Sequence, residues 1–218
     1  MMRWNKKEFW NQDIGSIGIG AMIVFIAMVL VAGIAASVLI QTSTKLEAQA
    51  MTTGTETTQE VSSGLAVTNV LGHKNTDLDK IMIMVRTRAG SDEIDIAKTY
   101  IEITDTNTKC ILEYDSSSHV DNLGVDDMFS ASVFPGSAYQ FGMLVVEDAD
   151  SSISDTTPVM NSGDKAYLCF DTDSGTVFNA EIGERTDMWG MVVPEQGSQG
   201  VISLSTPASY NHVVVDLQ

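Results

Sequence analysis

The chain contains two different patterns of hydrophobic and polar positions. From Ser16 to Thr44 none of the 29 residues is charged. Apolar side chains would cover every side of a helix built from this stretch, as in helices surrounded by lipid or by protein neighbours. As an α-helix it would reach ~44 Å, against ~30 Å of bilayer hydrocarbon. Leu46 and Ala50 continue an apolar stripe, so we predict a hydrophobic helix over residues 16–53.

The Thr- and Ser-rich stretch 54–64 indicates a linker or a frayed helix end. From Gly64 onward, short β-prone runs alternate with turn residues. This pattern predicts an antiparallel β-sandwich of immunoglobulin-like size over residues 65–218, and an α+β fold for the whole chain. The nine candidate strands are 65–71, 80–87, 98–104, 109–114, 140–147, 166–170, 189–193, 200–205 and 211–217.

Charge gives the chain an orientation. Arg3, Lys6 and Lys7 precede the apolar run, and only Glu8 and Asp13 oppose them. By the positive-inside bias, residues 1–15 are expected in the cytoplasm and the rest outside. Overall, 12 Lys and Arg stand against 29 Asp and Glu, a net charge of -17, which argues against nucleic acid as a partner.

The apolar segment has three readings. A secretory signal would be removed near "GIAAS" at 33–37, but its apolar core is usually only ~7–15 residues long. A permanent single-pass anchor fits the length. Gly15, Gly18 and Gly20 in "IGSIGIGAM" favour the third reading, in which a cytoplasmic peptidase cuts ahead of the run and the helix is kept. The glycines do not indicate a dinucleotide loop, because no strand precedes them.

The run "GSIGIGAMIVFIAMVLVAGIAASVLIQTS" resembles the N-terminus of archaeal flagellins (archaellins). The resemblance covers residues 13–45 and implies that a prepilin-like signal peptidase cuts between Gly15 and Ser16, removing residues 1–15 as a class III signal peptide. Family members commonly carry a basic residue before the glycine, whereas Ile14 stands here, so Gly18 and Gly20 stay open as cut points. Bacterial type IV pilins carry Glu at the fifth mature position, which here is Gly20.

The resemblance also implies a function. The chain is expected to be a structural subunit of the archaeal flagellum filament, held in the cell membrane as a precursor and extracellular once assembled. Its expected partners are further archaellin copies, the peptidase and a separate assembly motor, and it needs no cofactor. Two alternatives stay open: an archaeal type IV pilin or adhesin that attaches cells to surfaces, and a membrane-anchored extracellular receptor or enzyme.

Packing in the filament core is expected along the helix. Small residues form two adjacent small-xxx-small rows, Ala32 with Ala36 and Gly33 with Ser37, which suit close helix approach. Apolar residues surround these rows. The candidate packing residues are Ile17, Ile19, Met22, Phe25, Ile26, Val29, Ala32, Gly33, Ala36, Ser37 and Leu39.

The domain after the helix shows no catalytic motif, and we assign no catalytic residue. Its three histidines lie in separate segments. Asp148 and Asp150 begin a turn that resembles a calcium loop, but Ile153 and Val159 replace the Gly and Glu that an EF-hand requires. Two interpretations stay open. The turn binds calcium or magnesium in a looser surface site together with Asp171 and Asp173, or these carboxylates simply lie in solvated acidic loops.

Two cysteines, Cys110 and Cys169, fall in strand-like runs. An exported domain can keep a disulfide, so the sequence leaves open both a bridge between them and two separate buried thiols. No N-x-S/T sequon occurs. Because archaellins are often N-glycosylated, its absence predicts an outer surface without sequon-linked glycan.

Overall fold

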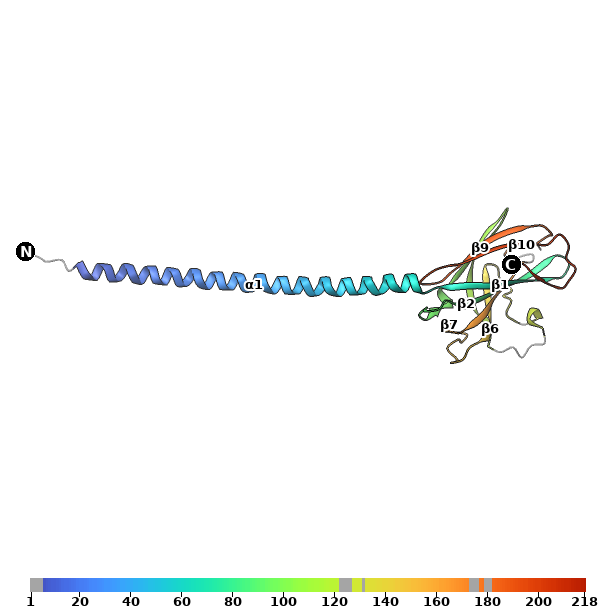
Figure 1. Cartoon of the computed structure of the whole chain (residues 1–218), viewed down its shortest axis with the longest axis horizontal. Coiled ribbons are helices and arrows are strands. Elements are labelled where there is room, and N and C mark those ends of the chain that lie inside the picture. The colour runs from blue at the N-terminus through green and yellow to red at the C-terminus, as the bar shows by residue number, and fades with distance from the viewer. Residues whose placement is uncertain (1–5, 122–126, 131, 173–176, 179–181) are drawn as a thin grey trace, which may run out of the picture. The chain divides into compact units, whose positions relative to one another are not determined.

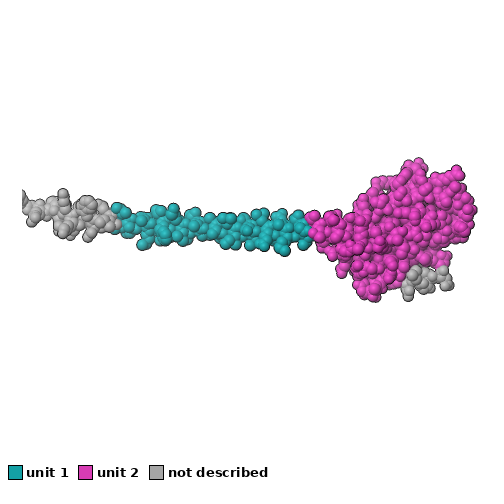
Figure 2. Space-filling model, viewed as in Figure 1, with its two compact units in different colours: residues 1–55 teal, residues 56–218 magenta. Residues whose placement is uncertain are grey.

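The computed structural model describes residues 6–121, 127–130, 132–172, 177–178 and 182–218, with backbone only for residues 6–14. The chain forms two compact units, residues 1–55 and 56–218 (Figure 2). One long helix, α1 (Lys6–Ser62), makes up the described part of the first unit (Figure 1). The helix continues past the boundary, so its last residues, 56–62, belong to the second unit.

The predicted helix is present, but the predicted linker over 54–64 is wrong, because α1 continues without a break to Ser62. Threonine disfavours helices partly because its side chain competes for backbone groups. Here the threonine hydroxyls donate to carbonyls of their own helix, as from Thr52 to Ala48 (3.0 Å) and from Thr55 to Met51 (3.1 Å). These hydroxyls are thereby satisfied without leaving the helix.

The second unit is built on a nine-stranded sheet with the order β10-β9-β4-β5-β6-β8-β2-β1-β11. Its strands are β1 (Leu65–Lys74), β2 (Leu78–Thr87), β4 (Tyr100–Asp105), β5 (Lys109–Val120), β6 (Gln140–Glu147), β8 (Lys165–Asp171), β9 (Asp187–Val193), β10 (Gly200–Ser205) and β11 (Val214–Asp216). A small second sheet pairs β3 (Ile94–Asp95) with β7 (Val159–Met160). Two short 3-10 helices are η1 (Ile96–Lys98) and η2 (Met128–Ser130).

The expected α+β fold, one long apolar helix followed by a mostly antiparallel sheet domain, is confirmed. The sheet differs in detail from an immunoglobulin-like sandwich. All nine strands belong to one hydrogen-bonded sheet, and β5 runs parallel to β6. Large twisted sheets tend to curl, and this one brings β1 beside β10, where a bridge joins Gly64 to Ser198 (Figure 1).

The curled sheet encloses the main hydrophobic core. Along β10 burial alternates strictly, as expected for a strand with one covered face. In β6, by contrast, residues 141–145 are all buried. A second, smaller hydrophobic cluster lies on the other side of the sheet. It contains Met82 of β2, Leu144 of β6 and Cys169 of β8, and Phe129 of η2 and Val133 cover them. The middle of the sheet is therefore packed on both faces.

Candidate functional site

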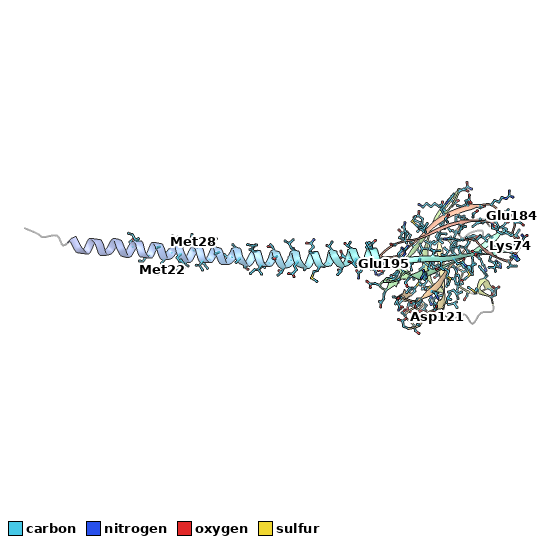
Figure 3. All side chains as sticks on the ribbon, in the orientation of Figure 1. Met22, Met28, Lys74, Asp121, Glu184 and Glu195 are labelled. Atoms are coloured by element: carbon cyan, nitrogen blue, oxygen red, sulfur yellow. The ribbon has the colours of Figure 1, made fainter. Side chains whose placement is uncertain are left out.

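The apolar surface of α1 is the most unusual feature of the molecule. Every large apolar side chain from Ile17 to Ile40 is exposed, with exposed fractions between 51% and 71%. Met22 and Met28 project from the helix in Figure 3. Its most apolar window has a mean hydropathy of 3.0 and none of it is buried, so α1 is long and apolar enough to cross a membrane. Burying one such side chain is worth about 1.5–3 kcal/mol, so this surface requires lipid or protein neighbours.

The surface is not uniform. Val24, Ala27, Met28, Val31 and Ala32 line a shallow apolar hollow, formed because two alanines lie among larger side chains. The small-residue rows predicted from the sequence are exposed as well. They hold Ala32 and Ala36, and Gly33 and Ser37. An added Cβ at Gly33 would meet nothing within 4 Å. All eleven predicted packing residues thus lie on one accessible helix, where a neighbouring helix can approach closely.

Gly15 and Ser16, the predicted processing site, lie inside α1 and are exposed. An added Cβ at Gly15, Gly18 or Gly20 would meet nothing within 4 Å, so packing within the chain does not explain these glycines. The position of the cut stays a prediction.

The end of α1 is fixed to the sheet by a set of hydrogen bonds that the sequence did not reveal. Gln59 Nε2 donates to Asp92 Oδ2 (2.8 Å), and a Glu60 carboxylate oxygen accepts from the Gly197 amide (3.3 Å). Ser63 is fully buried, and its carbonyl accepts from the Ser198 amide (2.9 Å). The last turn of α1 is therefore hydrogen-bonded to loops of the sheet domain, within the unit of residues 56–218.

The acidic turn forms a compact cluster. Oxygens of Asp148, Asp150 and Asp164 lie within 4.8 Å of one another. Asp148 accepts from backbone amides of residues 151–153, and Asp150 accepts from Asn161 Nδ2 (2.6 Å). The sequence pattern did not point to Asp164, because this residue stands 14 residues beyond Asp150, on the next strand connection.

The carboxyl groups of this cluster differ electrostatically. Burial raises the pKa of Asp164, and the neighbouring charges of Asp148 and Asp150 add to the shift. The hydrogen bond from Asn161 lowers the pKa of Asp150. Asp171 ends β8 and does not belong to the cluster, while Asp173 lies outside the described residues. A calcium or magnesium ion bound by Asp148 and Asp150 stays a prediction, with Asp164 as their structural neighbour.

The disulfide left open by the sequence does not form, since Cys110 and Cys169 are both free buried thiols. Cys110 lies in the main core on β5, whereas Cys169 lies in the cluster on the other side of the sheet on β8. β6 separates the two strands, so they are about 10 Å apart, beyond disulfide reach. Burial raises the pKa of both thiols.

His73 and His119 make separate local contacts. His73 Nδ1 contacts Asp79 Oδ1 (2.7 Å) beside the Phe129 ring. On β5, His119 contacts Asp121 through Nε2 and the Tyr114 hydroxyl through Nδ1 (3.1 Å). Burial, followed by the charge of Asp155, raises the pKa of Tyr114. The Tyr114 hydroxyl also donates to the Asp155 carbonyl (3.1 Å), which joins β5 to the loop at Asp155.

Comparison with known proteins identifies the family. The sequence model of the protein family called archaeal-type flagellin matches residues 15–204. The chain belongs to this family. Flagellin B2 of Methanocaldococcus jannaschii is 40% identical over 216 residues, covering 97% of this chain and 98% of the relative. Flagellin B3 of Methanococcus voltae is 38% identical over 240 residues, covering 97% and 99%.

Two solved structures share the flagellin fold. The crystal structure of archaeal flagellin FlaB1 from Methanocaldococcus jannaschii has a TM-score of 0.64 at 30% identity, covering 72% of this chain and 97% of that one. The archaeal flagellum of Methanospirillum hungatei strain JF1 has a TM-score of 0.63 at 14% identity, covering 92% and 98%. The resemblance inferred from residues 13–45 is thus confirmed across nearly the whole chain.

Proposed function

We propose that this chain is a structural subunit of the archaeal flagellum filament and serves swimming motility. The single observation that carries the proposal is the accessible apolar surface of α1, which the same chain joins to a folded sheet domain. Such a subunit can bury its helix among copies of itself while its domain faces solvent. Membership of the archaeal-type flagellin family favours this reading over a type IV pilin or adhesin.

The proposed assembly route has two stages. The precursor waits in the cell membrane with α1 in the bilayer, and the prepilin-like peptidase removes residues 1–15. The helix then leaves the lipid and joins a helical array, either of this chain alone or mixed with other archaellins. Heterologous contacts of this kind extend without closing a ring, as a filament requires. A separate assembly motor would supply the work.

Deletion of the chain tests the proposal in cells. We expect loss of filaments from the sheared fraction and loss of swimming in wet mounts, both restored by the wild-type chain. Cells that swim normally but no longer attach to surfaces would favour the adhesin instead. A chain that stays with the membranes after shearing, with residues 1–15 intact, would indicate an anchored receptor or enzyme.

A further inference from the structure

The lysines and the arginines of the sheet domain differ in whether their side chains have partners within the chain. Residues 56–218 contain five lysines and three arginines, and every lysine is engaged within the chain. By contrast, none of the three guanidinium groups makes a hydrogen bond or ion pair within the described residues. The lysine partners are the Tyr210 carbonyl for Lys74, the Phe129 carbonyl and Phe134 ring for Lys80, Glu195 for Lys98, Glu102 for Lys109 and Glu147 for Lys165.

Two of the free arginines line one groove. Residues 86–89 and 162–165 enclose a hollow of about 230 Å³, and Arg86 and Arg88 are exposed there. Arg86 stands directly opposite Lys165 in the pairing of β2 with β8. Like charges at such positions destabilise a sheet, and Glu147 contacts only the Lys165 side of this pair. Asp164 also lines the hollow, but its side chain is almost fully buried and forms no ion pair with either arginine within the described residues. The exposed guanidinium groups therefore have no anionic partner within the described part of the chain.

The groove lies next to the end of α1. The Arg88 amide donates to the Gly64 carbonyl (3.0 Å), two residues after α1 ends at Ser62. The Ser91 hydroxyl accepts from the Gly64 amide (3.3 Å). These hydrogen bonds place the groove beside the segment that follows α1, within the unit of residues 56–218.

We propose that the Arg86–Arg88 groove binds surface carboxylates of a second copy of this chain, which ties neighbouring sheet domains together in the filament. The inference rests on the proposed function, because the filament brings the copies close. The charge of the domain indicates that a second copy fills the groove. Residues 56–218 carry 26 Asp and Glu against eight Lys and Arg, so adjacent copies repel each other unless unpaired basic side chains bridge them. The planar arginine fork suits bidentate binding of a carboxylate.

Zero-length cross-linking tests the contact directly. Arg88→Lys places a primary amine in the groove, and a carbodiimide joins an amine to a carboxylate only when the two touch. In sheared filaments of this variant we expect covalent dimers and longer ladders above the wild-type level. Arg185→Lys is the matched control, since Arg185 is also unpaired within the described residues but lies outside the groove. Its filaments should stay at the wild-type level.

A dimer yield equal to that of the wild type and of the control overturns the inference, as does cross-linking to a different protein. In either case, intact filaments in the same sample leave the proposed function standing. Absence of filaments from wild-type cells would instead contradict the proposed function.

A second variant pair removes the charge. Filaments of Arg86→Gln with Arg88→Gln should dissociate several degrees below wild-type filaments at low salt. The difference should vanish near 1 M salt, where the Debye length is ~3 Å. Lys98→Gln with Lys109→Gln removes the same charge from residues paired within their own chain. Equal losses in the two double variants, or a loss independent of salt, would overturn the groove contact.

Discussion

At the scale of single residues, the junction between α1 and the sheet depends on Gly197. Its φ of +87° is unfavourable for other residues, and an added Cβ would lie 2.2 Å from the Ser63 carbonyl oxygen. Gly90 has a similar φ of +84°, but nothing lies within 4 Å of its Cβ position. Gly90→Ala therefore measures the backbone strain alone, about 1–2 kcal/mol, and Gly197→Ala should cost clearly more.

Thermal unfolding of the detergent-solubilised chain, followed by the circular dichroism of the sheet, measures both variants. Equal destabilisation by the two substitutions would show that the close approach of Ser63 to Gly197 does not constrain the junction.

Asp164 gives the domain a pH dependence. Burial raises its pKa above the value in the unfolded chain, so its contribution to stability is fully present below the unfolded pKa and is lost as the pH rises through the folded pKa. Asp164→Asn keeps an acceptor for the Asn161 amide but carries no charge. Without divalent cations, the variant should be more stable than the wild type at pH 7, with no such gain at pH 3.

The same pair of proteins tests the predicted cation. If calcium or magnesium binds beside Asp148 and Asp150, millimolar calcium should raise the melting temperature of the wild type and have less effect on Asp164→Asn. A melting temperature of the wild type unchanged by calcium would reject the site. A gain from Asp164→Asn at pH 3 equal to that at pH 7 would contradict the pKa argument.

The two cysteines provide a covalent test of the fold. Because Cys110 and Cys169 lie in separate clusters on two sides of the sheet, both should react with maleimide after denaturation without a reductant. Neither should react quickly in the native chain, where both are buried. Intact mass spectrometry that finds the denatured chain unlabelled and about two mass units light would reveal a disulfide.

At the scale of elements, a larger side chain on α1 should not disturb folding of the single chain, but it should block packing against the helix of another copy. Gly33→Leu improves the helix propensity by about 1 kcal/mol, and the space around Gly33 within the chain is empty. A larger side chain would nevertheless block a helix that packs against Gly33 and Ser37. We therefore expect the variant to fold and reach the membrane but to give few or no sheared filaments.

Val31→Leu is the control, since it adds one methylene at a position that is already large. Electron microscopy and immunoblots of sheared and membrane fractions provide the comparison. Normal filaments from Gly33→Leu cells would show that the small-residue rows do not make the helix contacts.

The sequence predicted the elements better than their ends and partners. The uncharged run from Ser16 predicted α1, because it is too long for a strand and a helix satisfies its own backbone hydrogen bonds when lipid or protein surrounds it. Its end at Ser62 was missed, since propensity disfavours threonine while the hydroxyl bonds to Ala48 and Met51 depend on the helix already being present. The short strands β3 and β7 were missed as well, because two-residue pairing leaves no periodic pattern.

Contacts between distant segments were beyond the sequence pattern. Asn161 links Asp164 to Asp150, because its backbone amide donates to Asp164 and its side-chain Nδ2 donates to Asp150. Cys110 and Cys169 alternate to different faces of the sheet, and an alternation shows which face a residue takes only after the strand order is known. The helix that carries the expected packing residues was predictable, because it requires no tertiary partner within the chain, while their packing against other copies stays a prediction.

At the scale of the whole molecule, the helix and the sheet domain have separate tasks in the proposed filament. The apolar helix provides cohesion between copies, while the acidic sheet domain keeps the outer surface soluble and makes neighbouring domains repel. The Arg86–Arg88 groove would offset part of this repulsion near the junction. The central claim is that α1 is kept intact on the assembled subunit after a cut at its N-terminal border.

Mass spectrometry of the N-terminal peptide from material sheared off the cells tests that claim most directly. We expect a peptide that begins at Ser16, or at the residue after Gly18 or Gly20 if the peptidase uses one of those glycines. A chain that begins near Ser37, or that occurs only in membranes with residues 1–15 still attached, would contradict it.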